Sequence, residues 1–481
     1  MPRPEFDIVV IGGGAGGLVV AAGGAALGAK VALIDKERLG GDCLWYGCVP
    51  SKTLIKSARI AFQMRHADRW AIPSIEPRPD LAQVMERVRA VIAQIEPNDS
   101  PERFRGLGVE VILGAGRFVS PQAYEVNGRT LTAHWFVIAT GSRPAVPPIT
   151  GLSEVPFLTN ETLFDLREPV PHLVILGAGP IGCEIAQAFC RLGSKVTAID
   201  MAARILPRED ADAAEVVHRQ LQSEGVRFHL GARVAGVALG EPHGDRIRVT
   251  VRDADGGAGE VTGSHLLVAT GRTPNLDGLG LDLAEVRLDQ GRLRLDNGVR
   301  TTNRRIYAIG DAAGPYAYTH MAEHHASVVL RHAIFRMRWV KPNTVVPWCT
   351  FTDPELAHVG TSETDARTHG IDHRVYRFAF ADIDRARAEG ETGGFAKLVT
   401  EPGGKLIGAS IVGAHAGELI AECVLAMQRG LNVKALTETI HIYPTLASIN
   451  RRAADQRLRE GLTPRTRRLI QVLFGLRGAR T

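Results

Sequence analysis

The stretch from Asp7 to Asp35 reads DIVVIGGGAGGLVVAAGGAALGAKVALID and decides the fold of this 481-residue chain. It begins with the apolar, β-branched run Asp7–Ile11, which predicts a short buried strand. The glycine-rich turn Gly12–Gly17 comes next, then a helical stretch, Leu18–Leu27, and a second strand over Lys30–Ile34. This order of strand, glycine turn, helix and strand predicts a βαβ unit in a parallel sheet.

The turn carries the pattern G-x-G-x-x-G at Gly12, Gly14 and Gly17. Glycines in this arrangement let the backbone approach a pyrophosphate, which then sits at the N-terminus of the following helix. Asp35 closes the second strand, where an acidic side chain bonds the hydroxyl groups of a ribose. Strand, turn, helix and terminal acid together predict a dinucleotide site.

The same unit recurs at residues 172–200. His172–Leu176 predicts a strand, and Cys183–Leu192 predicts the helix that follows a second glycine turn. Lys195–Ile199 predicts a strand that ends at Asp200, and the glycines of the turn are Gly177, Gly179 and Gly182. Two dinucleotides bound in one chain indicate electron transfer between them; the alternative is a second unit kept only as scaffold.

The remaining segments divide between domain crossings and a separate C-terminal region. Phe136–Pro144 (FVIATGSRP) and Leu266–Pro274 (LLVATGRTP) each predict a buried strand that runs into a glycine turn, and Arg304–Asp311 predicts another strand. From Trp348 onward the pattern predicts an α+β domain without a glycine fingerprint, which favours assembly over cofactor binding. Its predicted elements are the strands Val375–Phe380, Gly394–Val399 and Leu406–Val412 and the helix Glu418–Arg429.

Composition places the chain among soluble globular proteins, with 45% hydrophobic and 23% charged residues. No apolar run reaches the ~18 residues that a membrane span requires. Glu5 and Asp7 occupy the region that would be basic in a secretory signal. We therefore expect a cytoplasmic protein.

Positive charge is concentrated at the C-terminus, where nine arginines lie between Asn450 and the end against Asp455 and Glu460. The net charge of the whole chain is only +5, so we expect no nucleic-acid partner for the body of the protein. A tail helix beginning at Thr463-Pro464 either packs on its own dimer or rests on a membrane surface as a basic amphipathic helix. Its apolar face holds Leu469, Val472, Leu473 and Leu476.

The first dinucleotide unit is followed by the segment Cys43–Lys52, CLWYGCVPSK. A zinc site would need a second pair of ligands, and the sequence offers no other Cys or His pair to complete a site with Cys43 and Cys48. A close pair at the start of a helix, beside a bound dinucleotide, favours a redox role. The other cysteines are interpreted as buried packing residues, and no metal site is expected; they are Cys183, Cys190, Cys349 and Cys423.

With these motifs, the sequence resembles the flavin-dependent pyridine nucleotide-disulfide oxidoreductases over residues 5–455, a family that includes dihydrolipoamide dehydrogenase, glutathione reductase and mercuric reductase. The resemblance implies an α/β fold with two Rossmann-like domains and a C-terminal α+β dimerisation domain, and hence a homodimer. The implied ranges are 1–150 for FAD, 151–275 for NAD(P)H, 276–345 for a second part of the FAD and central domain, 346–455 for dimerisation and 456–481 for a basic amphipathic tail.

The resemblance also implies which residues hold the two cofactors. For FAD these are Gly12, Gly14, Gly17, Asp35, Lys52, Gly116, Thr140, Gly141, Ser142, Gly310, Asp311, Thr319 and His320, with Asp311 on the ribityl chain and His320 along the flavin. For NAD(P)H they are Gly177, Gly179, Gly182, Glu184, Asp200, Val234, Gly271 and Arg272. Asp200 is followed by neutral residues as far as Arg204, which predicts NADH over NADPH because an acid disfavours a 2′-phosphate.

The redox roles follow from the same resemblance. It implies that Cys48 is the thiolate facing the flavin and that Cys43 is the exposed thiol that meets the substrate. Lys52 is expected to pair with Glu184 beside the flavin.

One segment departs from the disulfide reductases of the family, which carry H-P-T with a glutamate five residues after the histidine. Here Tyr443 stands at the position of the base and Ser448 at that of the glutamate, within HIYPTLAS. A phenol, with a reference pKa near ~10, is a poor base at neutral pH. A tyrosine at this place is similar to mercuric reductase, although no cysteine follows Cys423 to deliver a metal ion.

The sequence therefore predicts an enzyme that passes electrons from NAD(P)H through FAD and the Cys43–Cys48 disulfide to a disulfide or soft-metal acceptor, with Tyr443 in the catalytic set. The alternatives are a dihydrolipoamide dehydrogenase-like activity, or a redox-sensing flavoprotein that turns over no disulfide.

Overall fold

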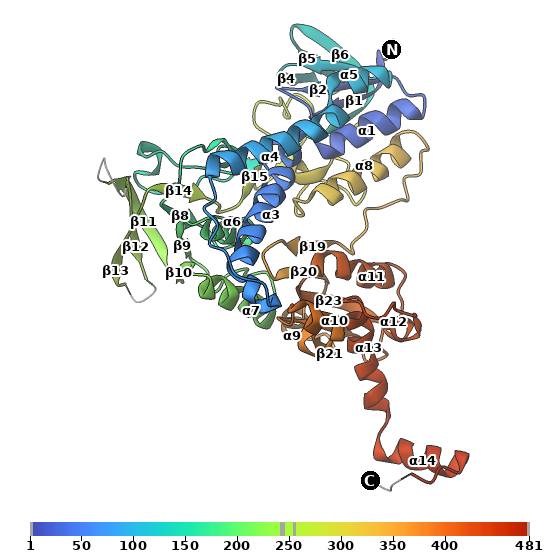
Figure 1. Cartoon of the computed structure of the whole chain (residues 1–481). Helices are drawn as coiled ribbons and strands as arrows, with labels where there is room; N and C mark the ends of the chain where they lie inside the picture. Colours follow the sequence, from blue (N-terminus) through green and yellow to red (C-terminus); the bar gives the residue numbers. More distant parts are fainter. Residues whose placement is uncertain (1–2, 241–245, 254–255, 479–481) are drawn as a thin grey trace.

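The computed structural model describes residues 3–240, 246–253 and 256–478. Figure 1 shows two sheet-and-helix domains above a third, C-terminal domain, with one helix projecting beyond it. The first domain contains a sheet of order β3-β2-β1-β6-β5-β4, to which β18 adds beside β6. Its strands are β1 (Phe6–Ile11), β2 (Val31–Asp35), β3 (Glu110–Leu113), β4 (Gly116–Ser120), β5 (Ala123–Val126), β6 (Arg129–Ile138) and β18 (Ile306–Ala308).

β1 lies at the centre of this sheet, parallel to both β2 and β6. Val9 and Ile11 pack into the core on one face of the sheet, and Ile8 and Val10 into the core on the other. A strand buried on both faces needs a continuous apolar run, which is why DIVVI predicts it well. The helices α1 (Ala15–Ala26) and α8 (Thr319–Ala333) cover one face side by side.

The second domain repeats the parallel arrangement, with a sheet of order β10-β9-β8-β14. A separate antiparallel sheet, β11-β12-β13, lies beside it (Figure 1). The elements are β8 (His172–Leu176), α6 (Pro180–Arg191), β9 (Lys195–Asp200), α7 (Ala211–Ser223), β10 (Arg227–Leu230), β11 (Arg233–Leu239), β12 (Ile247–Arg252), β13 (Ala258–Gly263) and β14 (His265–Val268). The short strands β7 (Ser142–Pro144) and β15 (Arg272–Pro274) pair where the chain crosses between the domains.

Three helices of the first domain place its reactive segment against the second. They are α2 (Gly41–Trp45), α3 (Cys48–Arg65) and α4 (Leu81–Ile95). α3 packs against both α4 and α6. This packing brings the first turn of α3 close to the second dinucleotide unit.

The C-terminal domain has a five-stranded antiparallel sheet of order β19-β20-β23-β22-β21. Its elements are β19 (Pro347–Thr350), β20 (Glu355–Gly360), α9 (Glu363–Thr368), β21 (Arg374–Ala379), α10 (Asp384–Glu389), β22 (Phe395–Thr400), β23 (Leu406–Gly413), α11 (Ala416–Gln428), α12 (Lys434–Glu438) and α13 (Ser448–Gly461). Beyond them α14 (Pro464–Phe474) extends away from the body of the protein (Figure 1).

Two sequence-based expectations need correction. The predicted strand Arg304–Asp311 is shorter, because only β18 pairs with β6 and Gly310, with φ +61°, begins a 3-10 turn. Cys190 and Cys349 are half-buried rather than buried. The Cys190 thiol donates to the carbonyl of Glu224 at 3.1 Å, so a polar contact accompanies its packing on α6.

Candidate active site

The first glycine turn has the geometry of a phosphate cradle. A Cβ added at Gly12, whose φ is +111°, would lie 2.3 Å from the carbonyl oxygen of Ala139, and one at Gly17 would lie 1.9 Å from that of Gly12. The fold itself therefore requires these two glycines. A Cβ at Gly14 would meet nothing closer than the Cα of Gly41 at 3.7 Å. The fold leaves Gly14 free for the close approach of a pyrophosphate at the N-terminus of α1, as FAD requires.

The second turn repeats this division of roles. A Cβ at Gly177 would lie 2.5 Å from the carbonyl oxygen of Ala269, and one at Gly182 would lie 2.0 Å from that of Gly177. Gly179, the N-cap of α6, has no atom within 4 Å of where its Cβ would stand. The residues present fit a second pyrophosphate, as a nicotinamide dinucleotide requires.

Each terminal acid also holds its own turn. Asp35 Oδ2 accepts from the backbone N–H of Gly13 at 2.7 Å, and Asp200 Oδ2 accepts from that of Ala178 at 2.6 Å. The other carboxylate oxygen of Asp200 accepts from Ala202 at 2.7 Å. The carboxylates are thus fixed at the carboxyl ends of β2 and β9, beside the glycine turns.

The two cysteines of the reactive segment lie on either side of a break between helices. Cys43 is in α2 and half-buried, so it is less exposed than expected, whereas Cys48 is the first residue of α3 and exposed. The Cys48 sulfur lies 3.6 Å from the hydroxyl of Thr319 at the start of α8. A hydrogen bond from the Cys43 thiol, helped by Thr319 and Lys52, lowers the pKa of Cys48 to about 6. The same contact raises the pKa of Cys43 well above its usual range.

Lys52 and Glu184 meet as the resemblance implies. Lys52 Nζ lies 2.7 Å from Glu184 Oε2, and the side chain of Glu184 is only 7% exposed. The other oxygen of Glu184 accepts from the backbone N–H of Phe351 at 2.8 Å, and Lys52 Nζ lies 4.5 Å from the Phe351 ring centre. The pair therefore joins both dinucleotide domains to the residue that follows β19, a contact that the sequence did not indicate.

A polar cluster joins three predicted cofactor residues at the crossing of the domains. The Ser142 hydroxyl donates to Asp311 Oδ2 at 2.5 Å, and Arg272 Nε donates to the same hydroxyl at 2.7 Å. Burial raises the pKa of Asp311, while the bond from Ser142 opposes that rise. Arg272 also lies 3.0 Å from Asp42, a residue that sequence reasoning missed although it precedes Cys43.

The remaining predicted residues lie in the following places. The hydroxyl of Thr140 donates to the carbonyl of Asn275 at 2.7 Å, and the Gly141 carbonyl accepts from the Asn275 N–H at 3.0 Å. His320 Nε2 lies 2.9 Å from the carbonyl of Pro347. Gly116 begins β4, Val234 lies in β11, and Gly271 has φ +140° just before β15. A Cβ at Gly116 would lie 2.4 Å from the Glu125 carbonyl oxygen, so packing alone requires glycine at that position.

Tyr443 lies between α12 and α13, and its side chain is strongly exposed. Its hydroxyl donates to Asp384 Oδ2 at 3.2 Å, and this bond raises the pKa of the phenol. His441, by contrast, has a buried ring whose Nε2 lies 3.0 Å from Glu422 Oε1. No hydrogen bond joins either residue to Cys43 or Cys48 within the described part of one chain.

The lowered pKa of Cys48 gives a pH-dependent prediction. Because the thiolate is the nucleophile, the alkylation rate of Cys48 in the reduced protein should rise as the pH increases through about 6 and be lost below it. Cys43 should stay unreactive over the same range. Iodoacetamide labelling followed by peptide mass spectrometry measures both rates. In Cys43→Ala the midpoint for Cys48 should move to higher pH; an unchanged midpoint would show that Cys43 does not stabilise the thiolate.

Comparisons with known proteins agree with this geometry. Two family models match the chain: pyridine nucleotide-disulphide oxidoreductase over residues 6–328 and the dimerisation domain of the same family over residues 346–454. The chain is 36% identical over 451 residues to a dihydrolipoyl dehydrogenase of Chlamydia muridarum, covering 92% of this chain and 95% of that one. It is 33% identical over 445 residues to a mercuric reductase of Bacillus cereus, covering 92% of this chain and 70% of that one.

Solved structures match over nearly the whole length as well. The HOCl-induced flavoprotein disulfide reductase RclA of Escherichia coli, solved as a Cu(II) complex, has a TM-score of 0.83 at 27% identity and covers 94% of this chain and 100% of its own. LpdA of Mycobacterium tuberculosis has a TM-score of 0.84 at 30% identity, and the match covers 94% of this chain and 99% of LpdA. The chain belongs to the pyridine nucleotide-disulphide oxidoreductase family, as a flavoprotein enzyme whose dimerisation domain implies a homodimer.

Proposed function

We propose that this enzyme passes electrons from NADH through FAD to the Cys43–Cys48 pair, and from that pair to an external disulfide or a soft metal ion. The observation that carries the proposal is the placement of Cys48 at the start of α3, where the Cys43 thiol donates to it and its sulfur lies 3.6 Å from the Thr319 hydroxyl. Bound FAD would supply hydride acceptance from nicotinamide and two-electron transfer to the disulfide. The first glycine turn, at the N-terminus of α1, would hold its pyrophosphate.

The protein's own groups prepare the thiol pair for exchange. Cys43 keeps its proton because its pKa is raised, and it donates to the Cys48 thiolate. Lys52, paired with Glu184, adds positive charge that stabilises the thiolate. Anaerobic addition of NADH to the oxidised holoenzyme should create two new thiols, at Cys43 and Cys48, for each NADH consumed, counted by alkylation after the protein is denatured. No new thiol at either residue would overturn the proposal and favour a flavoprotein without disulfide turnover.

The external electron acceptor is proposed from the metal ions named for two groups of similar proteins and from the chemistry of thiolates. Mercuric reductases and a copper-bound disulfide reductase are among the matches, and thiolates are the ligands that soft metal ions prefer. The usual His-Glu dyad is replaced at its two positions by Tyr443 and Ser448. We therefore propose that soft metal ions and small disulfides, rather than dihydrolipoamide, are the preferred substrates of the Cys43–Cys48 pair.

Tyr443 is proposed to act from the partner subunit near Cys43. Tyr443→Phe should then slow reduction of the external acceptor at least ~tenfold, because a positioned proton donor is lost, and leave flavin reduction by NADH unchanged. Rapid-mixing measurements of the two half-reactions separate these effects. Asp384→Asn, which removes the phenol's partner within the chain, serves as the control for local structure. Equal loss in both half-reactions would show that Tyr443 is structural.

We propose that NADH is preferred over NADPH. The Asp200 carboxylate is fixed by two backbone N–H groups beside the second turn, where a 2′-phosphate would meet like charge. Arg204 donates instead to the carbonyls of Leu206 and Pro207, at 3.1 and 2.8 Å. Steady-state kinetics should give a kcat/KM at least ~tenfold higher for NADH, which corresponds to ~1.4 kcal/mol. Asp200→Asn should lower the ratio of kcat/KM for NADH to kcat/KM for NADPH. A clear preference of the wild type for NADPH would contradict the proposed role of Asp200.

The tail is proposed to rest on an anionic membrane surface. Among the residues that the structure describes, no helix is long and apolar enough to cross a membrane. α14 has no buried residue, lies beyond the matched dimerisation domain and has no acidic residue along its length. Its exposed apolar side chains, flanked by arginines, suit the interface of an anionic bilayer; they are Leu469, Val472, Leu473, Phe474 and Leu476.

Sedimentation with lipid vesicles tests this contact. The protein should bind vesicles that contain phosphatidylserine much more than vesicles of phosphatidylcholine alone. Leu473→Ser with Phe474→Ser should abolish binding. Unchanged dimerisation in that variant, together with lost vesicle binding, supports the membrane contact, whereas a loss of dimerisation would show that α14 packs on the partner subunit.

A further inference from the structure

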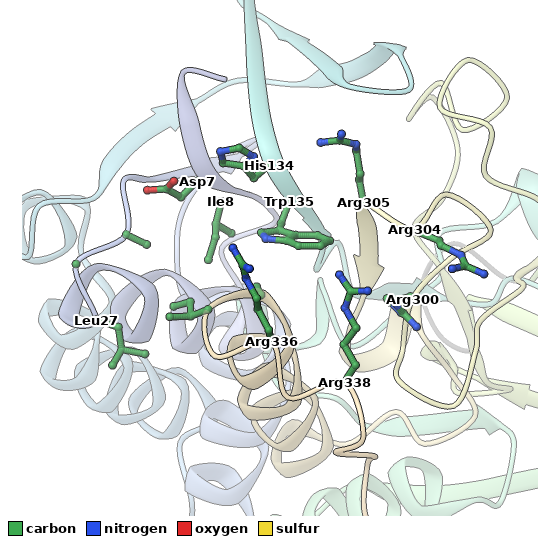
Figure 2. A pocket seen from close by; sticks show the side chains of 14 residues that line it. Asp7, Ile8, Leu27, His134, Trp135, Arg300, Arg304, Arg305, Arg336 and Arg338 are labelled. Atoms are coloured by element: carbon green, nitrogen blue, oxygen red, sulfur yellow. The ribbon is translucent and has the colours of Figure 1, made fainter. Parts of the chain in front are cut away.

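A cavity of about 640 Å³ opens at the amino edge of the first sheet, opposite the edge that carries the glycine turn. It lies where β1 begins, beside Trp135 of β6 and the residues that precede β18 (Figure 2). Its volume is within the range of small-molecule sites. The two dinucleotide turns and the cysteine pair contribute nothing to its lining, so it is a separate site.

The cavity is strongly positive. Five arginines line it against one aspartate, Asp7, whose Oδ2 already accepts from the Lys30 backbone N–H at 2.9 Å. The arginines are Arg300, Arg304, Arg305, Arg336 and Arg338. Arg300 pairs with Asp296 at 2.8 Å. Within the described ranges, no ion pair or hydrogen bond engages the guanidinium groups of the other four.

Hydrogen bonds stabilise the loop that carries two of these arginines. Arg336 and Arg338 lie in the loop after α8, where the Arg338 N–H donates to the Arg336 carbonyl at 2.9 Å and the Met337 N–H donates to that of Arg331 at 3.0 Å. His332 Nε2 lies 2.7 Å from the carbonyl of Val340, which ties the end of this loop to the helix. Five arginines thus share one cavity, and an anion bound there would reduce the repulsion between their positive charges.

Trp135 provides an aromatic wall. Figure 2 shows its ring between Arg305 and His134 on one side and Arg336 and Arg338 on the other. Behind it the Tyr307 ring lies 5.7 Å away, centre to centre, and fixes the indole in place. Planar guanidinium groups bind phosphate oxygens in pairs, and an indole face accepts a stacked ring.

We propose that this cavity binds a polyphosphate anion, inorganic or esterified to a nucleoside, as a site separate from the two dinucleotide sites. Arginines lie on both sides of Trp135 in Figure 2, which favours a ligand that carries two or more phosphates. A nucleoside polyphosphate would add a base that stacks on Trp135, and inorganic polyphosphate would use the arginines alone.

Calorimetric titration of the FAD-loaded enzyme, saturated with NAD⁺ to fill the nicotinamide site, tests the proposal with tripolyphosphate and with ATP as probes. Both should bind at low salt with one site per chain. Arg336→Gln with Arg338→Gln should weaken binding at least tenfold. Arg292→Gln with Arg294→Gln removes the same charge from exposed positions outside the lining of the cavity and should change the affinity less than twofold.

The outcomes separate the possibilities. Tighter binding of ATP that Trp135→Leu reduces to the level of tripolyphosphate identifies a nucleotide ligand, and equal binding of the two probes identifies the polyphosphate chain alone. Absence of binding to the wild type would overturn the site. Equal weakening in the two double variants would also overturn it, because the attraction would then come from overall charge. Flavin absorbance and thermal unfolding confirm that each variant is folded.

Discussion

A Cys48→Ser variant is expected to lose at least ~10³-fold of the NADH-dependent reduction of a disulfide or soft metal ion. The reason is that the lowered pKa of Cys48 makes it the thiolate of the pair, whereas a serine hydroxyl is not ionised at neutral pH and cannot form a disulfide. Flavin reduction by NADH should stay within about twofold, because the second glycine turn and Asp200 are untouched. Anaerobic stopped-flow measurement of flavin absorbance, followed by acceptor turnover, gives both numbers.

Two further variants make this result specific. Cys43→Ser should also lose turnover but leave an alkylatable Cys48, because a serine hydroxyl still donates toward the thiolate. Cys190→Ser is the matched control, since that half-buried cysteine of α6 bonds the carbonyl of Glu224, just after α7, and a serine keeps the bond. Turnover retained in Cys48→Ser with the same acceptor would show that electrons leave the enzyme without passing through the pair.

Much of the fold was predictable because its signals are local. The run DIVVI, the glycine turn and Asp35 occupy 29 consecutive residues, and β8 and β9 follow the predicted bounds closely. The strand predicted from Arg304 was too long because the pattern of apolar residues does not show where pairing with β6 stops. Pairing partners depend on distant chain segments, which a local pattern does not contain.

The site was predictable only in part for the same reason. The Lys52–Glu184 pair came from a family resemblance, and periodicity alone would not have joined an α3 lysine to an α6 glutamate. The bond from the Phe351 N–H to Glu184 and the contact between Asp42 and Arg272 were missed. Every residue except proline has a backbone N–H, so the sequence does not show which of them binds Glu184. Asp42 contacts Arg272 only in the folded chain, and its position beside Cys43 does not predict that contact.

One buried lysine pairs with carboxylates at the contact between the second and C-terminal domains. Lys397 in β22 is 3% exposed, and its Nζ lies 2.6 Å from Asp212, 2.9 Å from Glu363 and 3.3 Å from Asp210. Asp210 is itself only 2% exposed. The lysine thus neutralises carboxylates that come from two domains, and the sequence, where Lys397 interrupts an apolar strand, gives no reason to expect it.

Lys397→Met is expected to lower the free energy of unfolding by about 3–5 kcal/mol, because removing one partner leaves a buried carboxylate without its counter-charge. Methionine keeps most of the side-chain volume, so the change in packing is small. The matched control is Lys405→Met, whose partner Glu401 lies 3.7 Å away at the surface and whose loss should cost under ~1 kcal/mol. Denaturant unfolding of the FAD-loaded dimer compares the two. Adding Asp210→Asn to Lys397→Met should restore part of the loss, because the unpaired charge is then gone; equal destabilisation by both lysine variants would show that the cluster contributes no more than a surface pair.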